Sequence, residues 1–182
     1  MKKNILFFSL IIFYLCISVR ADQWPNPEKE NIYSQSKEYL VKIIPGYSIG
    51  DLDGFKGAPT GDYAKSEFFK RNNAGHYELL KEIFLVNPVA PVNCFLNNNN
   101  YLITLDNWHN KGYGKIVAIY SPDGKLIKSY ELKDLFSKEE IEQFSSSISS
   151  IAWRNHNYNS FDEIGNVFYI WANTKQRSQI LT

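Results

Sequence analysis

The chain has 182 residues, with 20 Lys and Arg against 19 Asp and Glu, giving a formal net charge of +1. Three of the basic residues and none of the acidic ones lie in residues 1–21, so the rest of the chain has 17 against 19, a net charge of −2. This balance excludes a basic surface for binding nucleic acid or anionic lipid. About 160 residues can bury one hydrophobic core, so a single domain is expected at residues 22–182.

The N-terminus has the three parts of a secretory signal peptide. Lys2 and Lys3 precede the apolar run Ile5–Ile17, and Ser18–Ala21 supplies the small residues of a cleavage site. The apolar run has about 13 residues, whereas a membrane-spanning helix needs about 20. We therefore predict a signal peptide at residues 1–21 and an exported protein, periplasmic or extracellular, without stable membrane insertion.

Only Cys94 remains after removal of the predicted signal peptide, which excludes an intramolecular disulfide framework. Its neighbours Val92 and Phe95 are apolar, so we expect Cys94 to be a small buried hydrophobe. An intermolecular disulfide is the alternative.

The predicted elements begin with an extended arm at residues 22–31, which holds two prolines and scattered charges. A strand is predicted at Glu38–Ile44, because its residues are mostly β-branched or aromatic and Pro45 and Gly46 follow directly. The glycine-rich stretch that continues through Asp62 is predicted to be a long loop.

β-Hairpins are predicted along the middle of the chain. Ala64–Lys70 and His76–Phe84 flank Asn and Gly residues that tolerate the positive φ of a tight turn. Val92–Leu96 and Tyr101–Leu105 flank a run of asparagines in the same way.

A further hairpin is predicted at residues 115–132. Lys115–Ser121 is apolar on both alternating faces, which predicts a central strand that is covered on both sides. Ser121–Gly124 has the residue types of a tight turn, and Lys125–Leu132 is predicted to return as the partner strand.

One short helix is predicted after the signal peptide. Ser137 and Glu140 have the spacing of a capping box, which predicts a helix that continues to about Phe144. Strands are predicted at Ser149–Trp153 and Val167–Ala172, and none is predicted after them.

The predicted strands repeat along the chain. Tyr39–Ile44 is similar to Tyr101–Leu105, and the hairpin that starts at Phe68-Phe69 aligns with the one that starts at Ile119-Tyr120. The alignment places Gly75 and Gly124 at matching turns, and a partial third copy follows without a returning hairpin. This order of strands and turns is typical of propeller blades.

Two segments carry a resemblance to known proteins over about half of the chain that follows the predicted signal peptide. The stretch from Tyr101 through SPDGKLIKSYEL resembles blades of YVTN and NHL-like propellers, and LDNWHNKGYG resembles a motif of uncharacterised exported bacterial proteins. The resemblance implies a mainly β fold of antiparallel sheets with propeller-blade-like repeats.

A closed propeller needs at least four blades, whereas the repeats amount to about two and a half. We therefore expect an open arrangement of sheets in a monomer. The alternative is a homodimer that pairs through an open edge at Val167–Ala172.

The loop after Tyr101–Leu105 brings together carboxylate, amide, indole, imidazole and phenol groups, a mixture typical of recognition sites. His156 lies in the corresponding loop of the next repeat, where it could approach the loop's own histidine. The binding hypothesis comprises six residues: Asp106, Asn107, Trp108, His109, Tyr113 and His156.

A structural role is the alternative for this loop. Trp108 would plug the end of the core, Asp106 and Asn107 would hydrogen-bond the turn, and Gly112 and Gly114 would permit its backbone. Under the binding hypothesis the partner is an unknown protein or small molecule, and no cofactor is expected.

A small secreted serine hydrolase is the alternative function. Gly46–Gly50 matches the G-x-S-x-G nucleophile elbow, with Ser48 as nucleophile and His109 or His156 as base. The motif requires a helix after the serine, whereas a glycine-rich stretch follows it here. We therefore expect a non-catalytic binding module.

No metal site is predicted. Asp51, Asp53 and Asp62 lie in one loop, but they do not match the EF-hand pattern of calcium ligands. The histidines lack the paired spacing of zinc ligands.

N-terminal sequencing of the exported product tests the signal peptide, and we expect the sequence to begin at Asp22. Cys16 offers the competing outcome of a lipoprotein, although Leu15 stands where that processing prefers a small residue. A blocked, lipid-bearing Cys16 would overturn the prediction.

Overall fold

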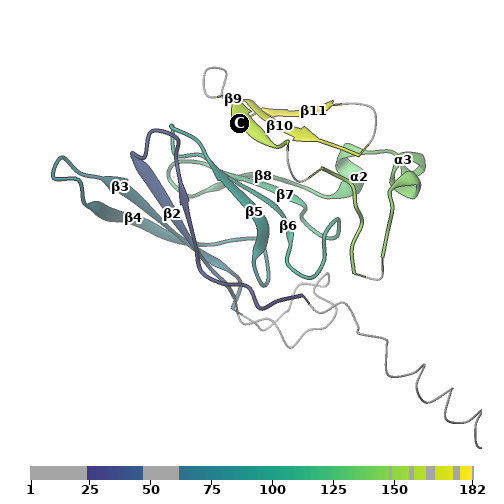
Figure 1. Ribbon diagram of the computed structural model, residues 1–182, viewed down its shortest axis with the longest axis horizontal. Coiled ribbons are helices and arrows are strands. Elements are labelled where there is room, and N and C mark those ends of the chain that lie inside the picture. The colour runs from purple at the N-terminus through teal and green to yellow at the C-terminus, as the bar shows by residue number, and fades with distance from the viewer. Residues whose placement is uncertain are drawn as a thin grey trace, which may run out of the picture.

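The computed structural model describes residues 24–46, 62–147, 149–155, 158–162, 167–173 and 177–181, the last range by its backbone only (Figure 1). The predicted signal peptide and most of the glycine-rich loop lie outside these residues. The described chain is mainly β, with three antiparallel sheets and two short helices. No described helix is long and apolar enough to cross a membrane.

The first two sheets have the same plan, in which four strands pair antiparallel in chain order (Figure 1). The first contains β1 (Glu30–Tyr33), β2 (Tyr39–Ile44), β3 (Lys65–Arg71) and β4 (Tyr77–Phe84). The second contains β5 (Pro91–Leu96), β6 (Leu102–Asn107), β7 (Val117–Tyr120) and β8 (Leu126–Tyr130). Every strand predicted from residue 38 to residue 132 is confirmed, with small shifts at the ends.

Strand β1 corrects the predicted arm. Glu30 and Asn31 were expected in the arm, but they pair with Ile43 and Lys42 of β2. The strand is mostly exposed, so its sequence lacks the apolar alternation by which strands are recognised, and its partner strand supplies the pairing instead.

The two sheets share an irregularity at the position that the sequence repeat aligns. The pairing of β3 with β4 shifts by one residue between Phe68 and Phe69, and that of β7 with β8 shifts between Ile119 and Tyr120. These are the residue pairs that the repeat places in register. Because a bulge depends on local backbone geometry, its recurrence supports structural equivalence of the two hairpins.

The turns of the two hairpins also match. The N–H of Gly75 donates to the Asn72 carbonyl, and the N–H of Gly124 donates to the Ser121 carbonyl, at 2.9 and 2.8 Å. Each glycine has a positive φ, 88° and 75° respectively. In both turns the first side chain accepts a hydrogen bond from the N–H that follows the glycine.

The third sheet is built from β9 (Ser160–Asp162), β10 (Val167–Trp171) and β11 (Arg177–Leu181), with β10 in the centre. This corrects two expectations, because a strand does return after β10 and the proposed dimerisation edge is already paired. The sequence of β11 begins with three polar residues, so it lacks the apolar pattern from which a strand is predicted. The three sheets form no closed propeller within the described residues.

The predicted strand Ser149–Trp153 is wrong. Its backbone forms isolated bridges only, from Ser150 to Lys111 and from Ile151 to Ser146. Single backbone hydrogen bonds, such as that from the Ile151 N–H to the Lys111 carbonyl, and the core side chain of Trp153, which is 1% exposed, hold the segment without a strand ladder.

The helix predicted from Ser137 is confirmed as α3 (Lys138–Gln143), with both hydrogen bonds of the capping box present. A second helix, α2 (Leu132–Leu135), corrects the expectation of only one. Its N-cap is Glu131, whose carboxylate is 2.9 Å from Lys115 Nζ and 2.8 Å from Lys133 Nζ. The two ammonium groups hold the pKa of Glu131 at about 2.

Two apolar clusters cover opposite faces of the second sheet. Leu102 and Ala118 join the cluster shared with the first sheet, whereas Ile103 and Ile119 join the cluster shared with the third sheet and the helices. All four residues of β7 are buried, which confirms that this strand is covered on both sides.

The cysteine of β5 lies at the border of the core. Cys94 is half-buried and packs against the cluster between the first two sheets. Burial raises the pKa of its thiol well above the ordinary value, and the Glu30 carboxylate adds to this effect. The expectation of a small apolar residue is met in part.

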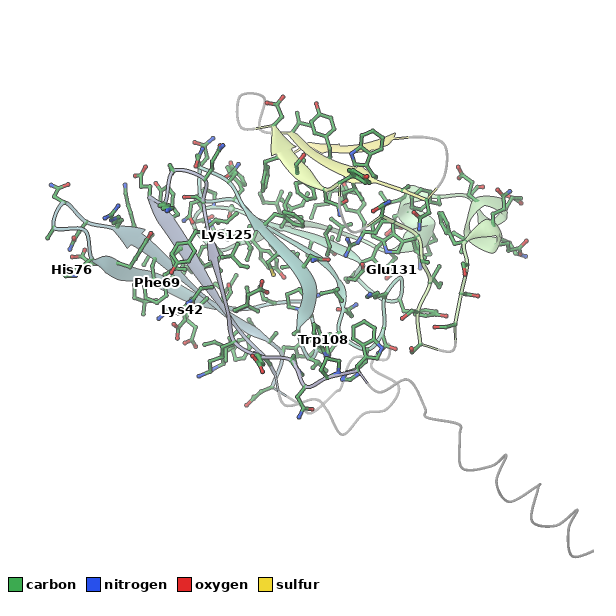
Figure 2. All side chains as sticks on the ribbon, in the orientation of Figure 1. Lys42, Phe69, His76, Trp108, Lys125 and Glu131 are labelled. Atoms are coloured by element: carbon green, nitrogen blue, oxygen red, sulfur yellow. The ribbon has the colours of Figure 1, made fainter. Side chains whose placement is uncertain are left out.

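The other face of the first sheet is covered by lysines lying over aromatic rings. Lys42 Nζ is 4.6 Å from the ring centroid of Phe69, and the two side chains lie next to each other in Figure 2. Lys65 Nζ is 4.9 Å from the ring centroid of Phe84. These contacts shield apolar area on a face that no other sheet covers among the described residues.

Alanine substitution at the two turn glycines tests the packing of the hairpins. Both variants place a Cβ at positive φ, which costs about 1 kcal/mol. A Cβ at Gly124 would also lie 2.8 Å from Ile83 Cγ2 of β4, whereas one at Gly75 would meet only the flexible Arg71 guanidinium, at 3.3 Å.

We therefore expect Gly124→Ala to lower the free energy of unfolding in urea by at least about 1 kcal/mol more than Gly75→Ala does. Equal losses would contradict the contact between the β7–β8 turn and β4.

Candidate functional site

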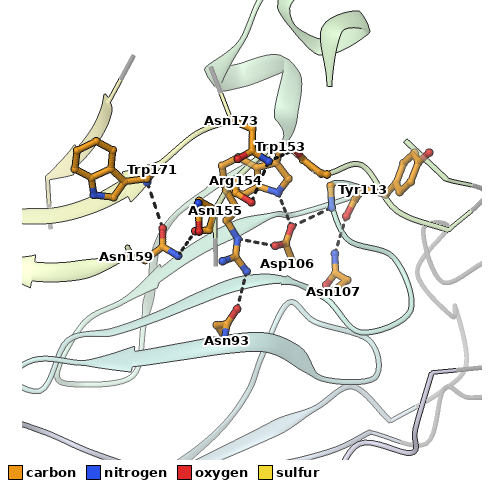
Figure 3. A network of polar contacts seen from close by, with 12 residues as sticks. Asn93, Asp106, Asn107, Tyr113, Trp153, Arg154, Asn155, Asn159, Trp171 and Asn173 are labelled. Carbon is orange, nitrogen blue, oxygen red and sulfur yellow. Dashed lines mark hydrogen bonds and ion pairs between the residues drawn. The ribbon is translucent and has the colours of Figure 1, made fainter. Parts of the chain in front are cut away.

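The predicted binding loop starts with a buried carboxylate. Asp106, at 1% exposure, accepts hydrogen bonds from Trp153 Nε1 and Arg154 Nε, each at 2.7 Å, and from the Gly112 N–H at 3.0 Å (Figure 3). Its φ of 58° is left-handed, one residue before the end of β6. The carboxylate thus joins both ends of the loop to the segment that precedes the third sheet.

Arg154 completes this network from the other side. Its side chain and that of Asp106 are each 1% exposed, so the ion pair is shielded from water. Arg154 Nη2 donates to Asn93 Oδ1 of β5 at 2.7 Å, while Nη1 is buried without a hydrogen-bond partner among the described residues. The pair therefore links the second sheet to the third.

Asn107 closes the loop. Its Nδ2 donates to the Tyr113 carbonyl at 2.8 Å, and its Oδ1 accepts from Asn87 Nδ2 at 2.9 Å. The hydrogen bonds of Asp106 and Asn107 are thus made within the protein. Both side chains hold the loop in shape, and this geometry agrees with the structural interpretation for these two residues.

Trp108 and His109 turn away from the core toward the start of the described chain. Trp108 Nε1 donates to the Pro25 carbonyl at 2.9 Å, and the Trp24 ring centroid lies 5.4 Å from that of Trp108 and 5.7 Å from that of His109. Trp108 lies at the lower end of the second sheet in Figure 2. Partial burial lowers the pKa of His109, which favours the neutral imidazole.

Lys111 also contacts Trp24. Its Nζ is 4.9 Å from the Trp24 ring centroid, a cation–π arrangement. Its carbonyl accepts a hydrogen bond from the Ile151 N–H at 2.8 Å, which fixes the loop against residues 150–151.

A pocket of about 380 Å³ opens between the arm, this loop, Ser147 and residues 150–154. We call it the Trp24 pocket. Aromatic, cationic, hydroxyl and aliphatic side chains face it together. Its lining consists of Trp24, Pro25, Asp106, Lys111, Ser147, Ser150, Ile151, Ala152, Trp153 and Arg154.

The structure divides the predicted site residues into different roles. Asp106 forms part of the pocket lining, and Trp108 and His109 support the Trp24 wall from behind. Tyr113 is half-buried and contributes its carbonyl to the loop. His156 lies outside the described residues.

Sequence reasoning missed Trp24, Arg154 and the two serines of the pocket. A tryptophan in a proline-rich arm was an available signal for Trp24, because exposed arms seldom retain a large aromatic residue without a contact. Ser150 fell in the predicted strand Ser149–Trp153 and Arg154 followed it directly, and neither was considered as a site residue.

The other chemistry considered in the sequence gains no support from the described residues. No group of three or more His, Cys, Asp or Glu residues among them is arranged to hold a metal ion. Ser48, Asp51 and Asp53 lie outside the described residues. His76 is exposed in the turn between β3 and β4, remote in the chain from the other histidines.

Comparisons with protein-family models, with curated proteins and with solved structures find no significant match. The geometry of the Trp24 pocket therefore carries the functional argument.

Asp106→Asn tests how much the buried ion pair contributes to the free energy of unfolding. The substitution preserves size and tolerates the left-handed backbone, but it leaves the Arg154 charge buried without a counter-ion. We expect the free energy of unfolding to fall by about 3–5 kcal/mol in urea denaturation.

Glu142→Gln is the matched control, because its pair with Lys138 is 3.8 Å long and exposed, and we expect a change within about 0.5 kcal/mol. Similar losses in the two variants would show that the buried pair does not anchor the loop.

Proposed function

We propose that this protein is an exported, non-catalytic binding module whose ligand occupies the Trp24 pocket. The observation that carries the proposal is the composition of that pocket, in which an aromatic wall, polar groups and an aliphatic wall converge on one concave surface. Ligand sites typically combine apolar area with a few polar groups that fix orientation.

The support behind the pocket favours binding over a purely structural role for the loop. The loop backbone is fixed by the buried Asp106 and Asn107, while Trp24, Lys111 and Ser150 retain exposed surface in front of them. Recognition sites often combine a rigid frame with exposed contact residues, because a frame that is already ordered reduces the entropic cost of binding a ligand.

The scaffold supports a propeller-blade-like origin for the sheets. Both complete sheets have the four-stranded meander of a blade, and in each the third and fourth strands carry a bulge and are joined by a turn that contains glycine. This regularity favours the resemblance to YVTN and NHL-like repeats.

A small molecule suits the pocket better than a protein partner does. The volume of about 380 Å³ falls near the lower end of the range for small-molecule sites, about 300–1,000 Å³. The serine-hydrolase alternative stays untested, because Ser48 and His156 lie outside the described residues.

A ligand screen with a pocket variant tests the proposal. The mature protein would be screened by thermal shift against sugars, organic acids, phosphate esters, amines and short peptides, with hits titrated by calorimetry. We expect at least one hit whose affinity falls tenfold or more in Trp24→Ala, since stacking on the ring is lost.

Tyr33→Ala removes an exposed aromatic side chain that does not line the pocket, so it should leave the affinity unchanged. The proposal fails if no compound binds, or if every hit binds Trp24→Ala as well as it binds the wild type.

A further inference from the structure

A second pocket lies where edge strands of the three sheets meet. Strands β1, β5 and β9 each stand at one end of the strand order of their sheet. All three contribute residues to the lining of this pocket, which has a volume of about 320 Å³. We call it the edge pocket. It shares no lining residue with the Trp24 pocket.

Three aromatic side chains line the edge pocket, one from each sheet. Tyr33 comes from β1, Phe95 from β5 and Phe161 from β9. Tyr33 is 49% exposed and the two phenylalanines are half-buried, so each retains surface that a ligand can reach. Aromatic side chains bind aromatic ligands through offset-stacked and edge-to-face contacts.

These aromatic rings are held in place by other rings. Phe168 of β10 is 0% exposed, and its ring centroid lies 4.9 Å from that of Phe95 and 4.9 Å from that of Phe161. The ring centroid of Tyr33 lies 5.9 Å from that of Tyr77. A ligand therefore meets walls that are already positioned, which reduces the entropic cost of binding.

The other residues of the edge pocket carry no charge either. Ile32 and Leu96 are aliphatic, whereas Gln35 and Cys94 supply an amide and a thiol. Because no charged residue of the described chain lines this pocket, an ionic ligand would lose hydration there without gaining a counter-ion. A neutral ligand with one polar group suits this lining, since the amide and the thiol can fix its orientation.

A nearby carboxylate disfavours anions in particular. Burial raises the pKa of the Cys94 thiol well above its ordinary value, and the charge of Glu30 raises it further. The thiol is therefore protonated and neutral at neutral pH. Since the charge of Glu30 reaches this lining residue, it also repels an anion that enters the edge pocket.

We infer that the edge pocket is a second binding site, for an uncharged aromatic molecule of one or two rings that lies against Tyr33, Phe95 and Phe161. The volume of about 320 Å³ is near the lower end of the range for small-molecule sites, about 300–1,000 Å³, so a larger ligand does not fit. The inference is independent of the ligand proposed for the Trp24 pocket.

Three naphthalene derivatives of similar shape and different charge test this inference. Naphthalenemethanol, naphthoate and naphthylmethylamine are neutral, anionic and cationic at neutral pH. Binding to the mature protein would be followed by the backbone amide signals of Cys94 and Phe161 in NMR titrations. We expect the alcohol to bind at least tenfold more tightly than the carboxylate, and the amine to bind more weakly than the alcohol.

Tyr33→Ala removes the most exposed aromatic wall. We expect it to lower the affinity for naphthalenemethanol at least fivefold, since a ring contact is lost. Tyr158→Ala is the matched control, because Tyr158 is 61% exposed and lies outside the lining, and it should leave the affinity unchanged. Trp24→Ala should also leave it unchanged, which separates the two pockets. Well-dispersed spectra establish that the three variants are folded.

The thiol provides a second measurement that needs no substitution. Cys94 is the only cysteine after residue 21 and it lines the edge pocket, so a bound probe should shield it from reagents. We expect saturating naphthalenemethanol to slow the reaction of Cys94 with methyl methanethiosulfonate at least fivefold, as measured by mass spectrometry.

The outcomes separate this inference from the proposed function. Binding of either charged probe as tightly as the alcohol would overturn it, as would an affinity that survives Tyr33→Ala or a Cys94 reaction rate that the alcohol leaves unchanged. An affinity that falls in Trp24→Ala would assign the probe to the other pocket and overturn the inference as well. Failure of all three probes to bind would overturn it and leave the Trp24 pocket proposal intact.

Discussion

The buried carboxylate of Asp106 is the constraint on which the arrangement of the second half of the chain depends. A charge at 1% exposure is tolerated only with compensating donors, and these come from Trp153, Arg154 and the loop backbone. Arg154 in turn forms a backbone bridge to Ala172 at the end of β10. The requirement to neutralise one carboxylate thus brings the third sheet, the binding loop and the second sheet to a common point.

Sequence patterns predicted strands that are rich in apolar residues, such as β2 and β7, and strands that follow a recognisable turn, such as β4 and β8. Segments whose position depends on contacts with distant parts of the chain were missed or misassigned. Strand β1 is held by its neighbour, β11 has a polar beginning, and residues 149–153 are anchored by the Trp153 side chain. Such positions depend on tertiary contacts that local periodicity does not encode.

The same limit applies to the candidate site. The residue types of the loop at 106–114 were sufficient to single it out, but not to assign roles within it. Asp106 and Asn107 have the chemistry of ligand-binding residues, and only the hydrogen-bond partners show that both serve the frame. Trp24 lies more than 80 residues from Trp108 along the chain, as the 83-residue separation of the Pro25–Trp108 hydrogen bond indicates, and sequence spacing gave no reason to join them.

The lysines over Phe69 and Phe84 have a consequence for solubility. No other described sheet covers this face with its phenylalanine rings, so a second molecule could stack on it, and burying these ammonium groups in such a contact would cost their hydration. At high protein concentration, the cost of removing water from these ammonium groups therefore opposes stacking of copies at this face. The first sheet can remain the outer layer of the stack without becoming a nucleus for aggregation.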